Sequence, residues 1–294
     1  MGVALMADQL ISVILPVFNG GIYLADAVHS ILNQTHQNIE LIIINDGSTD
    51  QTGELLALWQ KCDARIRVCS RPNRGLVASL NEGIDLAHGQ WIARMDADDV
   101  SFPRRLECQL QLLTANPAID VLATRAVTID ENNRITGLFP WGQSHEAICR
   151  RPWLGFHFPH PTWMGKAEWF RKYHYSSRGT ALCEDQELLL RSYRHSTFAT
   201  HHAILFAYRL RSATDWERLA KTRCAVIRFQ HDFFVQSRMY PCVVFSRAAF
   251  LVKKLRDFAC KLTGATCHPS MTEVNKDTIA EWDELLRKLH FINR

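Results

Sequence analysis

A short apolar run ends in three carboxylates at Trp91-Ile92-Ala93-Arg94-Met95-Asp96-Ala97-Asp98-Asp99. Its first five residues have the length and composition of a buried strand, interrupted only by Arg94. Three like charges at one strand end repel one another, so the fold must supply water, a cation or hydrogen-bond donors there. Because Asp also clusters in solvated turns, the stretch taken alone is compatible with a turn as well as with a binding site.

Three similar apolar runs precede this one, at residues 10–16, 39–44 and 66–69. Apolar residues at helical spacing then predict helices at about 22–32, from Asp50 or Thr52 through Trp59, and at about 76–87. Four strands that alternate with helices predict a parallel sheet covered on both faces. Ligands of such sheets bind beyond the carboxyl ends of the strands. Asn19, Asp46 and the three carboxylates follow three of these ends, so we expect them to converge.

Five motifs at these strand ends resemble the nucleotide-sugar half of family 2 glycosyltransferases in order and spacing. They are Pro16-Val17-Phe18-Asn19, Asn45-Asp46-Gly47-Ser48-Thr49-Asp50, Asn73-Arg74-Gly75, Asn81 and Met95-Asp96-Ala97-Asp98-Asp99. The resemblance covers about residues 10–215 and implies the α/β fold called GT-A, with a mixed, mainly parallel sheet flanked by helices. It implies a catalytic domain at 1–215, with a nucleotide-sugar half at about 10–100 and an acceptor half at about 101–215. Residues 216–294 would form a helical C-terminal extension.

The resemblance also implies how the donor is held. Carboxylates cannot bind a diphosphate directly, but they can bind it through Mn²⁺ or Mg²⁺, which accept carboxylate and phosphate oxygens together. We expect Asp98 to be the metal ligand, with Asp96 on the ribose and Asp99 in support. Asp46 would accept hydrogen bonds from the base or ribose, although it could also simply cap an Asp-Gly turn.

The remaining donor contacts are expected from Pro16 and Asn19, which would frame the base, and from Arg74, which would reach the nucleotide or its phosphates. In the second half, the pattern predicts a helix at about 103–114, a strand at 119–129, a tight turn at 132–133 and a returning strand at 135–139. Residues 151–165 are aromatic and Pro-rich without a clean period, which favours a loop that lines a cleft.

Glu184-Asp185 opens a further predicted helix. Acidic residues in a first turn suit the helix dipole, and this alone could explain them. The pair also resembles the second signature of the family, in which an acidic residue serves as the base. We expect Asp185 to be the base and Glu184 the next candidate, because adjacent helix positions point about 100° apart and only one can face the acceptor. A base that acts directly on the acceptor implies inversion at the anomeric carbon.

One position departs from the family pattern. In Tyr208-Arg209-Leu210-Arg211, an Arg stands where many relatives have a His that can bind the metal. Arg cannot ligate a cation, so we expect Arg211 to contact the diphosphate instead. His160, His201 and His202 are expected to be structural.

The composition is that of an ordinary globular protein: 294 residues, 47% hydrophobic and 22% charged. The start lacks the features of a secretory signal, and no stretch reaches the roughly 18 apolar residues of a spanning helix. Nine scattered cysteines without a C-x-x-C pair favour reduced thiols in a cytoplasmic protein. The net charge of +4 is uneven, because residues 221–261 carry nine Lys or Arg against two Asp.

The C-terminal segment reads as helices. A helix is expected at 216–236, a break at Tyr240-Pro241, and an amphipathic basic helix at 243–262. That helix could present a solvated charged face or dock on an anionic membrane surface, and nucleic acid is not expected as a partner. A last helix at about 278–291 could pack on its own chain or on a second subunit.

The sequence therefore predicts an inverting, metal-dependent glycosyltransferase of the cytoplasm or the inner membrane face. It would move a sugar, most simply from a UDP-sugar, to a glycan or lipid-linked acceptor in polysaccharide or glycolipid biosynthesis. The alternatives are a polyprenyl-phosphate glycosyltransferase and a nucleotide-sugar-binding protein without transfer activity.

Overall fold

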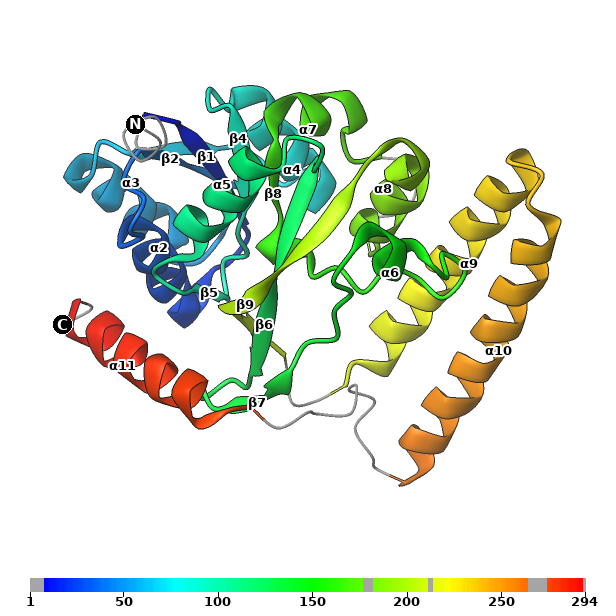
Figure 1. Cartoon of the computed structure of the whole chain (residues 1–294). Helices are drawn as coiled ribbons and strands as arrows, with labels where there is room; N and C mark the ends of the chain where they lie inside the picture. The colour runs from blue at the N-terminus through cyan, green and yellow to red at the C-terminus, as the bar shows by residue number, and fades with distance from the viewer. Residues whose placement is uncertain (1–7, 177–181, 211–213, 264–273, 293–294) are drawn as a thin grey trace.

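A computed structural model describes residues 8–176, 182–210, 214–263 and 274–292. A single mixed sheet runs through the protein, with helices on both of its faces and a helical C-terminal region (Figure 1). The strand order is β3-β2-β1-β4-β8-β6-β9-β5, and β7 pairs with β6. This architecture confirms the predicted fold class.

The first half of the sheet is parallel throughout, as the four apolar runs predict. Its elements are β1 (Ile11–Val17), α2 (Leu24–Leu32), β2 (Ile39–Asn45), α3 (Thr52–Cys62), β3 (Ile66–Ser70), α4 (Leu76–Leu86) and β4 (Trp91–Arg94). The helix predicted from residue 22 begins as the 3-10 turn η1 (Gly21–Tyr23). Every residue of β1 is buried, because helices cover the sheet on both faces.

The second half adds antiparallel pairs. Its elements are β5 (Val100–Ser101), α5 (Arg105–Ala115), β6 (Val121–Ile129), β7 (Ile135–Leu138), α6 (His145–Cys149), η2 (His160–Thr162), β8 (Met164–Lys166), α7 (Ala167–Tyr173), α8 (Glu184–Ser192), η3 (Tyr193–His195) and β9 (Phe198–Arg209). The short β8 lies between β4 and β6 and is antiparallel to both, whereas β6 and β9 are parallel. β8 thereby joins the two halves into one sheet.

The two faces of the sheet have separate cores. On one face, α2, α3 and α5 pack against residues of β1 and β2 such as Val13 and Leu41. On the other face, Ile14 and Ile42 meet α4, α7 and α8 together with aromatic side chains. Alternate residues of a strand therefore contribute to alternate cores.

The prediction that residues 151–165 line a cleft is largely wrong. Phe156, Phe158 and Trp163 are buried in the core beside α7 and α8. Aromatic side chains that fill the space between a sheet and irregular backbone follow no helix or strand period, so the sequence pattern could not separate a core segment from a cleft wall.

Among the described residues after β9, the chain forms three helices: α9 (Trp216–Gln236), α10 (Tyr240–Thr263) and α11 (Lys276–Ile292). The break after α9 lies at residues 237–239, and Tyr240-Pro241 starts α10 instead of breaking a helix. A Pro in a first turn removes an N–H that would have no helical partner. α11 packs on its own chain, where Trp282 lies 6.0 Å from Phe102 between ring centroids. Within the described ranges, every helix is too short or too polar to cross a membrane.

Candidate active site

The carboxyl ends of β1, β2 and β4 form one edge of the sheet. Ile14 pairs with Arg94 and Val17 pairs with Asn45 across neighbouring strands. The residues that follow, Asp46 after β2 and Asp96 after β4, therefore lie along the same edge as the end of β1. Pro16 is buried within β1, opposite Ile44, and reaches this edge as part of the strand.

Asn19 ties the first two loops of this edge together. Its backbone adopts the left-handed region at φ 52°, which Asn tolerates better than most residues. Its side-chain oxygen accepts a hydrogen bond from the Thr49 N–H at 2.8 Å, and its own N–H donates to the Ser48 hydroxyl at 2.9 Å. Asn19 is exposed, and its observed contacts hold the loop after β1 against the loop after β2.

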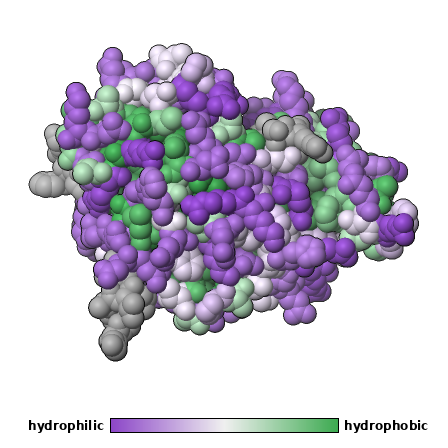
Figure 2. Space-filling model, turned by 90° about the horizontal axis from the view of Figure 1, so that it is seen from above, coloured by the Kyte–Doolittle hydropathy of each residue, from purple (hydrophilic) through white to green (hydrophobic). Residues whose placement is uncertain are grey.

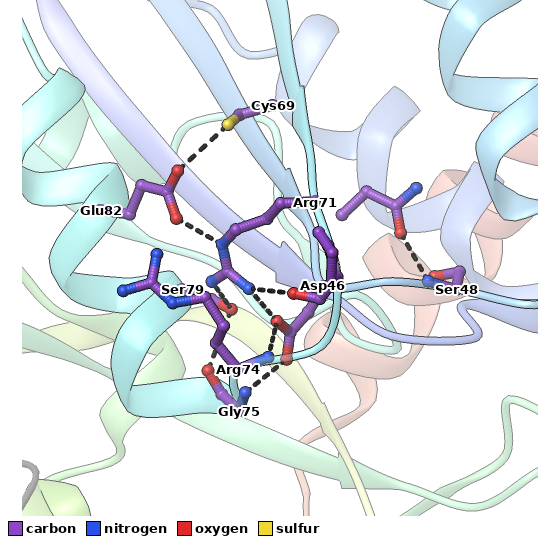
Figure 3. Close-up of polar contacts among 10 residues, drawn as sticks. Asp46, Ser48, Cys69, Arg71, Arg74, Gly75, Ser79 and Glu82 are labelled. Atoms are coloured by element: carbon purple, nitrogen blue, oxygen red, sulfur yellow. Dashed lines mark hydrogen bonds and ion pairs between the residues drawn. The ribbon is translucent and has the colours of Figure 1, made fainter.

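Asp46 organises the loop that follows β3 (Figure 3). Asp46 is 4% exposed, and its carboxylate accepts hydrogen bonds from the N–H groups of Arg74 and Gly75 at 2.8 and 2.9 Å. It also forms an ion pair with Arg71, whose guanidinium reaches Glu82 on its other side. Asp46 is thus far more than an Asp-Gly turn cap, because it fixes the backbone of residues 71–75.

Two glycines allow these loops to meet. Gly47 has φ 77°, and a Cβ there would lie 2.7 Å from the backbone nitrogen of Asn73. Gly75 has φ 85° and precedes α4. The side chain of Arg74 is exposed beside this junction and lines a hollow of about 610 Å³ that runs along α4.

The three carboxylates after β4 form a compact acidic cluster. Asp96, Asp98 and Asp99 each place an oxygen within 4.8 Å of the others. In an octahedral shell of Mg²⁺ or Mn²⁺, neighbouring oxygens are about 3 Å apart and opposite ones about 4.2 Å apart. The spacing therefore fits a divalent cation after a small adjustment. Asp98 is exposed, whereas Asp99 is only 1% exposed.

Asp99 itself supports the idea of a cation. One carboxylate oxygen accepts the backbone N–H of Arg209 at 2.7 Å, while the other is buried without a hydrogen-bond partner among the described residues. Burial and the charges of Asp98 and Asp96 raise the pKa of Asp99 well above its usual value. Although the Asp98 residue as a whole is exposed, desolvation of its carboxyl group and then the charge of Asp96 raise its pKa to about 6. A cation would relieve this repulsion.

Arg209 is a site residue that the sequence reasoning missed. It ends β9, is 7% exposed, and donates from Nε to the Asp98 carbonyl and from Nη1 to the Asp130 carbonyl, each at 2.7 Å. Its guanidinium lies 4.0 Å from the ring centroid of Tyr23. In the sequence, its only signal is its place in Tyr208-Arg209-Leu210-Arg211, next to the departure at Arg211. Arg211 lies outside the described residues.

Arg94 lies beneath the cluster and was also missed. It is 3% exposed and donates to Asp96 at 2.7 Å from Nη2. Its Nε and Nη1 are buried without hydrogen-bond partners in the described part of the chain. In the sequence it only interrupts an apolar run, and a lone Arg in a predicted strand carries no further signal.

Glu184 and Asp185 are the first two residues of α8. Glu184 is buried, with an oxygen 3.7 Å from Nδ1 of His160, whereas Asp185 is partly exposed. Gln186 donates to the Asp185 carboxylate at 3.1 Å and accepts the Phe156 N–H at 2.8 Å. The start of α8 is therefore anchored to the core, and Asp185 is the more accessible of the two acids.

Charge links the two acidic groups. Burial and then Asp185 raise the pKa of Glu184 to about 8, with a further contribution from Asp96 and an opposing one from Arg94. Burial raises the pKa of Asp185, while hydrogen bonding from Gln186 and the charge of Arg94 oppose the rise. The positive charge of Arg94 thus favours the ionised forms of Glu184 and Asp185 and pairs with Asp96. The two parts of the predicted site are therefore coupled electrostatically through one buried arginine.

The histidines lie apart from the acidic cluster. His160 is buried, hydrogen-bonds to the Tyr175 hydroxyl at 2.6 Å and packs edge-on against Trp163. Burial and Arg94 lower its pKa well below the usual value, so it is neutral beside Glu184. His201 and His202 stack on each other in β9. In the described ranges, the grouping of possible metal ligands contains Asp96, Asp98 and Asp99 and no histidine.

Sequence comparison finds relatives of this chain. The family model described as "Glycosyl transferase family 2" matches residues 12–174. The putative glycosyltransferase EpsE of Bacillus subtilis is 33% identical over 210 residues, which are 70% of this chain and 74% of that protein. Other relatives named as glycosyltransferases are 39–41% identical over shorter stretches, and the matched stretch spans only 17–42% of their length.

Solved structures share the fold at low sequence identity. S. aureus TarS 1–349 in complex with UDP-GlcNAc has a TM-score of 0.60 at 15% identity, covering 90% of this chain and 95% of that one. The mannosyltransferase PcManGT from Pyrobaculum calidifontis, in complex with GDP-Man and Mn²⁺, has a TM-score of 0.54 at 15% identity, covering 86% and 79%. At this identity the likeness concerns the fold alone.

Proposed function

The chain belongs to glycosyltransferase family 2, and we propose that it is a glycosyltransferase that transfers a sugar from a nucleotide diphosphate donor to a hydroxyl acceptor with inversion. The acceptor would be a glycan or lipid-linked glycan in polysaccharide or glycolipid biosynthesis. The observation that supports the proposal is the buried Arg94, which forms an ion pair with Asp96 at 2.7 Å and whose charge also acts on Glu184 and Asp185. Asp96 belongs to the acidic group that suits the donor, and Glu184 and Asp185 form the one that suits the acceptor.

On the donor side, Asp98 would be the ligand of Mn²⁺ or Mg²⁺, with Asp99 beside it. The metal would act as a Lewis acid on the leaving diphosphate, a contribution of several kcal/mol in related chemistry. Asp96, held by Arg94 at 2.7 Å, would accept a hydrogen bond from the ribose. The three oxygens within 4.8 Å and the partnerless Asp99 oxygen support these roles.

The nucleotide would lie along the edge formed by the ends of β1, β2 and β3. Pro16 and Asn19 would frame the base, and Arg74 would reach the nucleotide or its phosphates. Asp46 accepts one hydrogen bond on its second oxygen, from Gly75, which leaves capacity for a further donor from the base. UDP is our choice of nucleotide, in line with the UDP-GlcNAc bound by TarS.

On the acceptor side, Asp185 would remove the hydroxyl proton. A raised pKa makes a carboxylate a stronger base at neutral pH, and partial exposure leaves it accessible to an acceptor. Direct attack by the deprotonated hydroxyl on the anomeric carbon, with departure of the nucleotide diphosphate from the opposite face, inverts the configuration. Glu184 is buried, and we assign it the support of Asp185.

The same roles divide the chain into parts. Residues 10–100 would bind the donor, residues 101–215 would bind the acceptor, and residues 216–294 would form an extension. The polyprenyl-phosphate alternative has less support. A phosphate monoester acceptor is already largely ionised at neutral pH and needs no catalytic base, so this alternative gives Asp185 no catalytic role.

The test is a donor panel. We expect the protein with Mn²⁺ to release nucleotide from one sugar among UDP-, GDP- and dTDP-sugars, and chelation of the metal to abolish the release. The anomeric configuration of the product, read by NMR, should be opposite to that of the donor. Retention of configuration, or radiolabel that enters the organic phase as a sugar phosphate lipid, would contradict the proposal.

A further inference from the structure

One face of helix α10, here called the inner face, packs on α9 and on the segment at Trp153 and Leu154. Cys242 and Ser246 are buried on this face. Lys253 donates from Nζ to the Leu154 carbonyl at 2.7 Å, and Asp257 forms an ion pair with Arg223 of α9. These four positions are four, seven and four residues apart, so they share one side of the helix.

The opposite face of α10 is apolar and exposed. Its large side chains are 59–71% exposed, and they are Val244, Leu251, Leu255, Phe258 and Leu262. At about 100° per residue they form one stripe, roughly opposite the inner face. Scattered exposed apolar residues are normal, but a continuous stripe along more than four turns marks an interaction surface.

Positive charge borders this stripe. Arg247, Lys254 and Lys261 recur every seven residues and line one edge, and Arg256 lies on the other side; all four are exposed. The only carboxylate in α10 is Asp257, which is on the inner face with Arg223. The outer face therefore combines apolar and basic side chains without a negative one.

The surroundings leave this face open. α10 is the outermost element on its side, separated from the sheet by α9 (Figure 1). Seen from above, some green apolar surface lies among purple residues at this end of the molecule, besides larger green areas at the opposite end (Figure 2). Among the described elements, α10 packs against α9 and the segment around Trp153, on the side away from the stripe.

We propose that α10 lies flat on an anionic lipid bilayer, with its apolar stripe in the acyl region and its basic row on the headgroups. Lys and Arg at the edge of such a stripe extend their apolar stems along the membrane and keep their charges at phosphate level. A second copy of the chain is the less suitable occupant, because pairing two stripes would bring their basic rows together with no carboxylate between them. The inference is independent of the donor chemistry.

The experiment is flotation of the full chain with two kinds of vesicle, phosphatidylcholine alone and phosphatidylcholine mixed with phosphatidylglycerol. We expect binding to the anionic vesicles and release by salt. The Leu255→Asp/Phe258→Asp variant should lose binding, and Arg247→Ser/Lys254→Ser/Lys261→Ser should weaken it at least about tenfold. Both variants change exposed positions, so their thermal unfolding should match that of the wild type.

A charge-matched control removes three basic side chains from α11 instead, as Lys276→Ser/Arg287→Ser/Lys288→Ser, and should float like the wild type. Equal binding to neutral and anionic vesicles would overturn the proposal, as would wild-type binding by the Leu255→Asp/Phe258→Asp variant. Light scattering that shows a dimer, made monomeric by the same variant in the absence of any flotation, would assign the stripe to a second copy instead.

Discussion

The buried carboxyl of Asp99 offers a thermodynamic test of the metal site. Folding raises its pKa because of burial and the nearby Asp98 and Asp96. Without metal, this carboxyl therefore destabilises the folded state as the pH rises above its unfolded pKa of about 3.9. Asp99→Asn removes the charge and keeps the acceptor for the Arg209 N–H. At pH 7 without metal, we expect the variant to be at least as stable as the wild type.

With Mn²⁺ the order should reverse. At a concentration of about 100 times its Kd, a bound ion stabilises the folded state by about 2.7 kcal/mol. For a chain of this length the unfolding entropy is about 0.6 kcal/mol/K, so the wild type should gain about 4–5 °C in Tm. Asp99→Asn and Asp98→Asn each remove one of the three clustered carboxylate charges and should gain far less.

Differential scanning fluorimetry in Mn²⁺ and in EDTA measures both effects. Asp283→Asn, an exposed carboxylate on α11, is the matched control and should keep the full metal-dependent shift. A wild-type shift in Asp99→Asn would refute the placement of the ion among these carboxylates. A large loss of stability in the same variant without metal would refute the argument that its charge is uncompensated.

Three further predictions concern the supports of the site. Because the pKa of Glu184 is raised to about 8, its ionisation should destabilise the folded state increasingly between pH 4.5 and 8. Glu184→Gln should therefore be more stable than the wild type at pH 8 and show a flatter profile of Tm against pH. A profile identical to that of the wild type would contradict this prediction. Arg71→Met leaves the buried Asp46 unpaired and should lower the unfolding free energy by about 3 kcal/mol in urea titration while weakening donor binding, whereas intact donor affinity would show that this loop does not shape the site. Trp282→Ala removes a buried ring and its hydrogen bond to the Asn133 carbonyl, and should cost about 3–5 kcal/mol of stability; a loss under 1 kcal/mol would mean that α11 is not docked as described.

The parallel half of the fold was predictable because each of its strands is a nearly unbroken apolar run. β1 is buried throughout and β2 at every residue but Glu40, so nearly all of their residues are apolar and carry the signal. β8, in contrast, has three residues inside an aromatic segment, and its place between β4 and β6 depends on contacts far away in the chain. No local pattern can encode such a pairing.

The candidate site divides in the same way. Asp46, Asp96 and Asp98 follow predictable strands, and their positions at one edge are confirmed, while their roles remain predictions. Arg94 and Arg209 were missed because their importance comes from burial and from the carbonyl and carboxylate oxygens around them. A charged residue that supports a site is indistinguishable from a solvated one until its neighbours are known.

The most direct test of the central claim is to compare donor binding and turnover in Asp185→Asn. The variant keeps the shape of the side chain and its contact with Gln186, but it has no basic oxygen to take the acceptor proton. We predict that turnover falls by about 10²–10⁴-fold, while calorimetric titration with the donor and Mn²⁺ gives the wild-type affinity. Glu187→Gln, in the same first turn, is the control for a mere helix-dipole effect and should keep its turnover. Wild-type turnover in Asp185→Asn, or a loss of turnover matched by an equal loss of donor affinity, would contradict the account.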